Sequence, residues 1–215
     1  MPRYSEQQKA ALDALMKDTV YEKAIAIVTG EDLQALTMER LARDVGVSRG
    51  TIYNYFADRD AVVDFVVDRT FGPCKAAVES AARSDLSPAE QLTTIIEWVF
   101  DTLYDDRALV IALGSAGASN KGNSRSRRDR HDAIVAAVAT VIGNGVKSGE
   151  FRDLPPTFVG EIFFAAVRGL VDSMVDSGEF LPAAKVVPTF KRLFLDGLSS
   201  SPGAGLPGGS GKTPS

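Results

Sequence analysis

Residues 37–56, TMERLARDVGVSRGTIYNYF, decide the fold of this chain. The first half of this stretch has apolar residues at the spacing of one face of an α-helix, namely Met38, Leu41, Ala42 and Val45. Thr37 is suited to cap this helix. Gly46 is suited to end it, because glycine adopts the left-handed backbone conformation without a steric penalty. The stretch therefore predicts a short helix followed by a tight turn.

A second short helix is predicted directly after the turn. Ser48 can cap it, and only Ile52 and Phe56 are clear inward side chains. Polar or small residues remain for its flanks and outer face: Arg49, Gly50, Thr51, Tyr53, Asn54 and Tyr55. An α-helix fits the major groove of DNA, where base edges offer hydrogen-bond donors and acceptors. The pattern favours a DNA-recognition helix, although amphipathic helix pairs with a glycine turn also occur throughout helical proteins.

This stretch resembles the helix-turn-helix of the tetracycline-repressor (TetR) family of bacterial regulators. The resemblance rests on residue types at matching spacing: Thr37, Leu41, Ala42, Val45, Gly46, Val47, Ser48, Gly50, Tyr53, Tyr55, Phe56, Asp58, Arg59 and Asp60. It is strong over about residues 20 to 65 and departs from the family at Asp32, where a glycine usually precedes the motif. The resemblance implies an all-α fold, in which an N-terminal three-helix helix-turn-helix DNA-binding domain precedes a helical effector-binding and dimerisation domain.

The predicted DNA surface contains both base and phosphate contacts. Arg49 is the expected base contact, with Thr51 and Asn54 behind it. Phosphate contacts are assigned mainly to Thr37, Tyr53, Tyr55 and Arg59. The predicted surface is completed by Arg40, Ser48 and Gly50.

The charge of the chain argues against a nucleic-acid partner at first sight. The 215 residues are 45% hydrophobic and 24% charged, which is an ordinary globular composition, and the formal net charge is −4. Residues 1–65 alone hold eight Lys and Arg against eleven Asp and Glu. A positive field at the DNA must therefore come from geometry, with arginines facing the duplex and carboxylates facing away. The arginines concerned are Arg40, Arg43, Arg49 and Arg59.

Other classes of protein are disfavoured by the sequence. The N-terminus is polar and no apolar run reaches the roughly 18 residues of a membrane span, so we expect a cytoplasmic protein without a membrane partner. The one cysteine, Cys74, excludes an intrachain disulfide framework and is expected to be a small buried thiol. One histidine, His131, without a ligand set predicts no metal. No nucleophile–base pair or dinucleotide fingerprint is present, so we predict no enzyme activity, catalytic residue or cofactor.

Helices are predicted on both sides of the motif. Residues 5–29 are expected to be helical, in one piece or two. Another helix is expected from Asp60 to Arg83, with a kink or break at the Gly72–Pro73 pair because proline lacks a backbone donor and clashes with the preceding turn. We take this interruption as a hypothetical place for coupling between the two domains. The sequence SPAE from residue 87 marks the start of a further helix.

The second half of the chain continues the helical pattern. Residues 116–130 are expected to form a surface loop with an arginine cluster near its end. Helices are then predicted over residues 132–147, after the proline pair at 155–156, and after Gly178. The last two resemble the helix pair that forms a four-helix homodimer interface in the TetR family.

The predicted domains are a DNA-binding domain over residues 1–65, a ligand-binding and dimerisation domain over residues 66–198, and a disordered Gly/Pro/Ser-rich tail over residues 199–215. Aromatic residues of the second domain are candidates for lining an effector cavity: Phe71, Trp98, Tyr104, His131 and Phe163. The resemblance implies a ligand-responsive regulator, most often a repressor, that binds a palindromic double-stranded operator as a homodimer and is released by a small-molecule effector. The alternative is a helical small-molecule-binding protein whose DNA-binding role is minor or lost.

Overall fold

The structure is a computed structural model that describes residues 5–110 and 125–200. This part of the chain is built from helices, which confirms the predicted all-α class. They are α1 (Glu6–Gly30), the short 3-10 helix η1 (Leu33–Ala35), α2 (Met38–Val45), α3 (Arg49–Tyr55), α4 (Arg59–Ala81), α5 (Pro88–Asp105), α7 (Arg125–Ser148), α8 (Pro156–Ser177) and α9 (Ala183–Leu198). None of these helices is long and apolar enough to cross a membrane.

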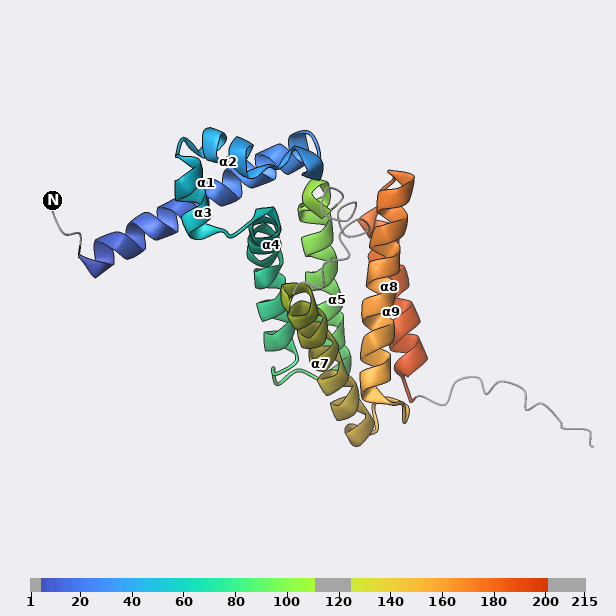
Figure 1. The fold of residues 1–215 in the computed structure, drawn as a ribbon. Coiled ribbons are helices and arrows are strands. Elements are labelled where there is room, and N and C mark those ends of the chain that lie inside the picture. Colours follow the sequence, from blue (N-terminus) through green and yellow to red (C-terminus); the bar gives the residue numbers. More distant parts are fainter. Residues whose placement is uncertain (1–4, 111–124, 201–215) are drawn as a thin grey trace, which may run out of the picture.

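The helices form two groups that share one helix (Figure 1). Helices α1, α2 and α3 gather at one end of the molecule, and the first turns of α1 project away from the rest. Helices α5, α7, α8 and α9 form a bundle at the other end, with α8 and α9 side by side at its edge. Helix α4 runs from the first group into the second.

Two buried clusters correspond to these groups, and α4 supplies side chains to both. Its N-terminal half buries Val62, Val63, Val66 and Val67 in the N-terminal cluster, and its C-terminal half buries Cys74, Val78 and Ala81 in the bundle cluster. Gly72 and Pro73 lie where the helix changes from one cluster to the other. The helix does not break at this pair, because α4 continues through Pro73. Pro73 is exposed, and both neighbouring segments of the helix are anchored in a core.

Helix α1 is one continuous helix, which settles the choice between one piece and two. Ser5 and Gln8 form a capping box at its start, and it contains no glycine or proline before Gly30. Its later turns bury Val20 and Ala24, but Leu12 and Leu15 in its first half are exposed. The first turns of α1 are therefore held by something other than core burial.

Helix boundaries in the second half differ from the prediction in two places. Helix α7 begins at Arg125, so the arginine cluster belongs to the helix and only residues 116–124 of the predicted loop remain, outside the described residues. Arg130 of α7 bonds to Asp68 of α4 at 2.7 Å, which supports this early start. Most of the predicted tail also lies outside the described residues, but its first two residues are ordered. Ser199 bridges to Phe151, and Ser200 donates its backbone N–H to Glu150.

The other predicted helix starts and ends agree with the structure. Ser87 and Glu90 form the predicted capping box at the start of α5. Helix α8 begins at Pro156 and ends at Gly178, whose φ of 70° is the left-handed conformation expected of a terminating glycine. Cys74 is buried, as predicted, and burial raises the pKa of its thiol, which keeps it protonated and unreactive.

Candidate nucleic-acid interface

The predicted helix-turn-helix is formed by α2 and α3. Thr37 caps α2 by accepting the backbone N–H of Arg40 at 3.2 Å, and Gly46 ends α2 with a φ of 84°. Ser48 caps α3 by accepting the backbone N–H of Thr51 at 3.1 Å. Three residues thus separate the two helices, and the hydroxyls of both capping residues already serve the backbone.

Helix α3 is anchored through a narrow face, as predicted. Ile52 is fully buried and Phe56, just past the end of the helix, is nearly so. Its exposed residues are Arg49, Gly50, Tyr53 and Asn54, whereas Thr51 and Tyr55 are half-buried. The outer face therefore presents a guanidinium, an amide and a phenol beside a glycine, which are groups able to contact base edges and phosphates.

Arg40 is bound within its own chain. Its guanidinium donates two hydrogen bonds to the carboxylate of Glu31, at 2.6 and 2.7 Å, and its Nε bonds to Asp44 at 3.4 Å. The hydrogen bond to Glu31 is the main reason why the pKa of Arg40 is raised, and the same bond lowers the pKa of Glu31. This arginine ties the end of α1 to α2, so the predicted contact of Arg40 with DNA would require it to give up these hydrogen bonds.

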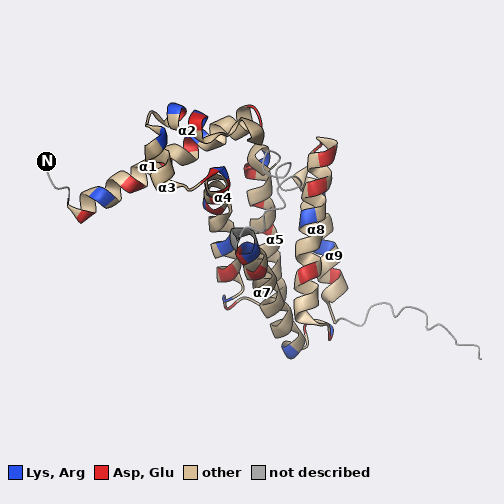
Figure 2. Ribbon diagram, in the orientation of Figure 1, with Lys and Arg blue, Asp and Glu red and all other residues tan. Residues whose placement is uncertain are grey.

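Arg49 and Arg43 also have carboxylate partners but are more exposed. The guanidinium of Arg49 lies 2.5 Å from Glu39, and that of Arg43 lies 3.3 Å from Asp44. Figure 2 shows Lys/Arg and Asp/Glu residues next to one another around α2. The expectation that the carboxylates face away is thus wrong for this surface, since acidic residues lie among the arginines and neutralise them.

Two of the predicted phosphate contacts are turned toward the protein. The Tyr55 hydroxyl donates to Asp13 of α1 at 2.7 Å, and this hydrogen bond is the main cause of the raised pKa of Tyr55. The Arg59 guanidinium donates to the carbonyl of Leu33 at 2.6 Å, and its Nε is buried. Both assignments stay predictions, and either group would have to give up a hydrogen bond in order to reach a phosphate. The exposed phenol of Tyr53 remains the predicted phosphate contact with the fewest constraints.

Asp13 was not singled out by the sequence. A signal for it exists, because Asp13, Met16, Val20 and Ala24 recur at the spacing of one helix face. The face that buries Val20 and Ala24 thus ends in a carboxylate. What the sequence lacks is any sign that Tyr55, far away in the chain, lies opposite this carboxylate.

The candidate effector-cavity residues lie in different surroundings. Phe71 packs against the N-terminal cluster, whereas Phe163 is fully buried in the bundle against Phe190 and Phe194. Trp98 is exposed on α5. The Tyr104 hydroxyl donates to the carbonyl of Leu181 at 2.7 Å. The structure therefore does not gather these residues around one described cavity.

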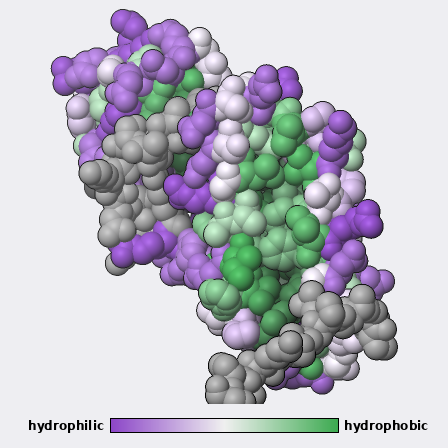
Figure 3. All heavy atoms as spheres, turned by 90° about the vertical axis from the view of Figure 1, so that its right-hand side faces the viewer, coloured by the Kyte–Doolittle hydropathy of each residue, from purple (hydrophilic) through white to green (hydrophobic). Residues whose placement is uncertain are grey.

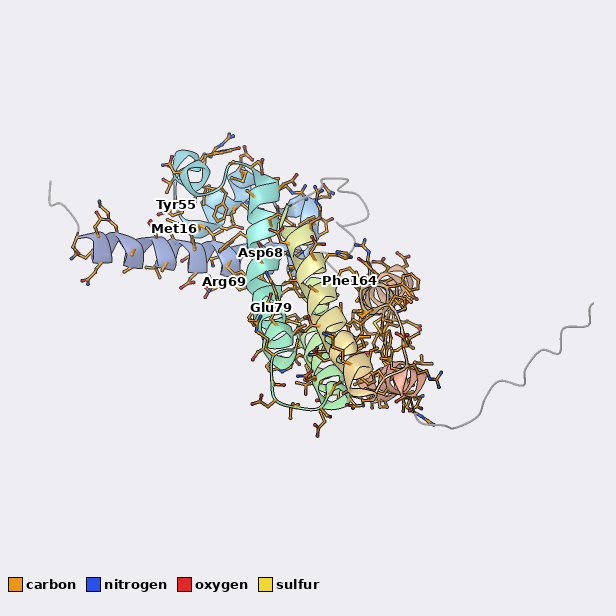
Figure 4. All side chains as sticks on the ribbon, turned by 90° about the horizontal axis from the view of Figure 1, so that it is seen from below. Met16, Tyr55, Asp68, Arg69, Glu79 and Phe164 are labelled. Atoms are coloured by element: carbon orange, nitrogen blue, oxygen red, sulfur yellow. The ribbon has the colours of Figure 1, made fainter. Side chains whose placement is uncertain are left out.

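His131 connects two helices of the bundle. Its ring nitrogens lie 2.9 Å from Asp132 and 3.0 Å from Glu161 of α8, and its ring packs edge-on against Phe164, which is labelled in Figure 4. The hydrogen bond to Asp132, assisted by that to Glu161, raises the pKa of His131. In the part of the chain that the structure describes, no three His, Cys, Asp or Glu residues are grouped as a metal site would require.

Comparison with known proteins assigns the helix-turn-helix to a family. The family model described as "Bacterial regulatory proteins, tetR family" matches residues 21–65. Residues 21–65 of this chain form a DNA-binding domain of the tetR family. The match contains α2, α3 and the later part of α1, but it begins well inside α1.

Relatives of this chain are distant in sequence. The nucleoid occlusion factor SlmA of Actinobacillus pleuropneumoniae is 26% identical over 102 residues, which cover 47% of this chain and 47% of the relative. The match thus spans about half the length of that protein. The HTH-type transcriptional repressor KstR2 of Mycolicibacterium smegmatis is 22% identical over 206 residues, which cover 88% of this chain and 94% of the relative.

A solved structure shares the fold of most of this chain. The transcriptional regulator FadR of Bacillus subtilis, in complex with stearoyl-CoA, superimposes with a TM-score of 0.70 at 17% identity. The alignment covers 83% of this chain and 97% of FadR. At this identity the likeness establishes the fold.

Proposed function

We propose that this protein is a ligand-responsive transcriptional regulator, a repressor that binds a palindromic operator as a homodimer and is released by a small-molecule effector. The observation that carries the proposal is the outer face of α3. Arg49, Tyr53 and Asn54 are exposed there, on a short helix that is capped by Ser48 and anchored by Ile52. A helix of this kind can enter the major groove while α2 supports it.

Exposed apolar residues on α8 and α9 support the homodimer. Phe158 and Ile162 of α8 and Leu193 of α9 are exposed in the single chain. Figure 3 shows hydrophobic residues gathered on the face of the molecule that carries α8 and α9. Gly169 lies on the same side of α8 as Phe158 and Ile162. A Cβ atom built at Gly169 would meet nothing within 4 Å, which leaves room for a close helix partner. Pairing of this face with its copy would form a four-helix interface.

A dimer also suits the proposed operator. Two recognition helices related by a two-fold axis read two half-sites about 34 Å apart, which is one turn of DNA. The effector would act by favouring a spacing of the recognition helices that no longer fits the two grooves, so that its binding energy shifts a conformational equilibrium.

A small molecule with a large apolar part is the proposed class of effector. The FadR structure contains stearoyl-CoA, and another solved relative, SmeT of Stenotrophomonas maltophilia, forms a complex with triclosan. Both relatives share the helical fold of this chain. The aromatic residues named above remain candidate contacts for such a molecule, with Trp98 of α5 the most accessible of them.

The test is a selection of bound sequences from random duplex DNA by the purified protein at near-physiological salt. Tyr53→Ala and Leu86→Ala are selected in parallel, because both side chains are about equally exposed, at 44% and 47%, but only Tyr53 lies on α3. We expect a palindromic motif with the unmodified protein and with Leu86→Ala, and its loss with Tyr53→Ala. If no motif emerges, the alternative of a helical small-molecule-binding protein without a DNA role takes the place of this proposal.

A further inference from the structure

Helix α1 starts well before the segment that matches the family. It begins at Glu6, whereas the family match begins at residue 21. We call residues 6–20 the α1 extension. Figure 1 shows its first turns projecting from the molecule beside α3. Its leucines are exposed, so their burial does not explain how the first turns of the extension are held.

The α1 extension is fixed to α4 by polar contacts. Asp18 forms an ion pair with Arg69 at 2.6 Å, and the Arg69 guanidinium lies 4.5 Å from the centre of the Tyr21 ring. The hydroxyl of Tyr21 is 3.1 Å from that of Thr70, which is buried. Because Arg69 and Thr70 are neighbours on α4, one turn of that helix sets the direction in which the extension leaves the N-terminal cluster.

The same extension reaches α3. Along the inward face of α1, Val20 is fully buried, Met16 packs against the N-terminal cluster, and Asp13 comes next. Asp13 accepts the hydrogen bond of the Tyr55 hydroxyl at 2.7 Å. Met16, Tyr55 and Arg69 are labelled in Figure 4, where α1 passes both α3 and α4.

Helix α3 has few anchors at this end, the chief one being the buried Phe56 just past its last residue. It has seven residues, and Ile52 is its one buried residue. Its start is held by the Ser48 cap, and its last residue is Tyr55. A hydrogen bond from Tyr55 to a rigid helix therefore restrains the end of α3 that the cap does not reach.

We propose that Asp13 is a positioning residue for DNA recognition, which acts by holding Tyr55 and thereby orients α3, so that the α1 extension is a working part of the DNA-reading unit. This inference rests on the proposed function. A contact of Asp13 with DNA phosphates is unfavourable, because a carboxylate repels them. The proposed benefit of Asp13 to DNA binding comes through Tyr55, from whose hydroxyl it accepts a hydrogen bond.

A direct contact of Tyr55 with DNA would make the loss of the Asp13 carboxylate change DNA affinity in the opposite direction. If the Tyr55 hydroxyl is needed at a phosphate, Asp13 competes with the DNA for it. Removing the Asp13 carboxylate would then free the hydroxyl, delete a negative charge, and raise affinity for operator and random DNA alike. If Asp13 positions α3, its removal lowers affinity for the operator and leaves affinity for random DNA undiminished.

The experiment measures the affinity of the full chain for the selected operator and for random duplex DNA. The variants are Asp13→Ala, Tyr55→Phe, their combination, and Asp13→Asn, whose amide oxygen still accepts a hydrogen bond. Glu22→Ala is the charge-matched control, because Glu22 is an exposed carboxylate elsewhere on α1. Thermal unfolding of each variant separates altered recognition from lost folding.

We expect Asp13→Ala and Tyr55→Phe each to weaken operator binding by about threefold to tenfold, the range for loss of one hydrogen bond. The combined variant should lose no more than either single variant, since both remove the same bond. Asp13→Asn should retain most of the operator affinity, and Glu22→Ala should not weaken operator binding.

Two results would overturn the positioning role: a gain in affinity for both DNAs with Asp13→Ala, or additive losses in the combined variant. Both leave the proposed function intact, because the unmodified protein still binds its operator. If the unmodified protein binds no specific DNA, the proposed function itself fails, and the role of Asp13 fails with it.

Discussion

Arg40 and Arg49 carry the same charge near the recognition helix but are bound differently. Arg49 has one exposed partner, Glu39, and an exposed ion pair contributes only about 0–1 kcal/mol in water. A phosphate can therefore replace that carboxylate at little cost. Arg40 would have to give up two hydrogen bonds to Glu31 and one to Asp44. A negative net charge is thus compatible with a DNA surface in which only some arginines are exchangeable.

Substitution of Gly50 tests how closely the DNA duplex approaches α3. A Cβ atom at this position would meet only the Ser48 hydroxyl, at 3.8 Å, so the protein itself does not require glycine there. Gly50→Ala should leave the fold intact and stabilise α3 by up to about 1 kcal/mol, since alanine is the better helix former. We expect its operator affinity to fall, because the methyl group occupies the space of the DNA backbone.

The control for this substitution is Gly143→Ala on α7, where a Cβ atom makes an ordinary contact of 3.7 Å with Pro156. Thermal unfolding and operator titration of both variants check the prediction. Unchanged operator affinity in Gly50→Ala would mean that the duplex stays away from the first turn of α3.

The raised pKa of His131 predicts that the stability of the fold depends on pH. Its pKa is raised in the folded state, first by the hydrogen bond to Asp132 and further by that to Glu161. A group whose pKa is raised on folding contributes stability that is complete below its unfolded pKa, about 6.5 for histidine, and that is lost as the pH rises through the folded value. The difference in unfolding free energy between the unmodified protein and His131→Gln should therefore be largest near pH 6 and small near pH 8.5.

Urea unfolding of both proteins at the two pH values measures this difference. Because the chain has one histidine, an NMR titration of untagged protein assigns the folded pKa without ambiguity. An equal difference at both pH values would show that protonation of His131 does not strengthen the junction of α7 and α8.

At the scale of elements, the contact of α7 with α8 depends on one glycine. A Cβ atom at Gly160 would lie 2.8 Å from the backbone oxygen of Val135 and 3.3 Å from its side chain. Gly160→Ala should force the helices apart and destabilise the protein by about 1–3 kcal/mol, the usual cost of overpacking. Gly143→Ala, in the same helix pair but without a close contact, should be at least as stable as the unmodified protein. Equal unfolding midpoints for the two variants would contradict this account.

The elements that sequence predicts best are those fixed by neighbours in the chain. The boundaries of α2 and α3 follow from Thr37, Gly46 and Ser48, which act within three or four residues of where they stand. The capping box of α5 is equally local. The continuity of α4 through Pro73 could not be decided from the sequence, because it depends on two cores that hold the helix on either side of the proline.

The predicted site shows the same limit. Residue types on α3 indicate a DNA-reading face, but they do not say which side chains the protein retains for itself. Tyr55 bonds to Asp13 and Arg59 bonds to the carbonyl of Leu33, and both partners are distant in sequence. Aromatic residues such as Phe163 have the same helical spacing whether they fill a core or line a cavity, so the effector site could not be located from the pattern.

At the scale of the whole molecule, the exposed face of α8 and α9 predicts the oligomeric state. Phe158 of this face and Leu15 of the α1 extension are both 63% exposed. Phe158→Glu should therefore produce monomers, whereas Leu15→Glu should remain dimeric, as measured by sedimentation. Loss of the dimer removes bivalent binding and should lower operator affinity by about 100-fold or more. A dimeric Phe158→Glu protein would place the interface elsewhere.

The sharing of α4 between two cores also limits how this protein can be recombined with others. A hybrid that joins this DNA-binding domain to a foreign effector domain at residue 65 would remove Val66 and Val67 from the cluster in which they are buried. Gly72 and Pro73 are the better junction, since Phe71 still packs against the N-terminal cluster and Cys74 already belongs to the bundle cluster. The grafted sensor must also supply an apolar side chain in place of Leu109, which follows α5 but is buried in the N-terminal cluster.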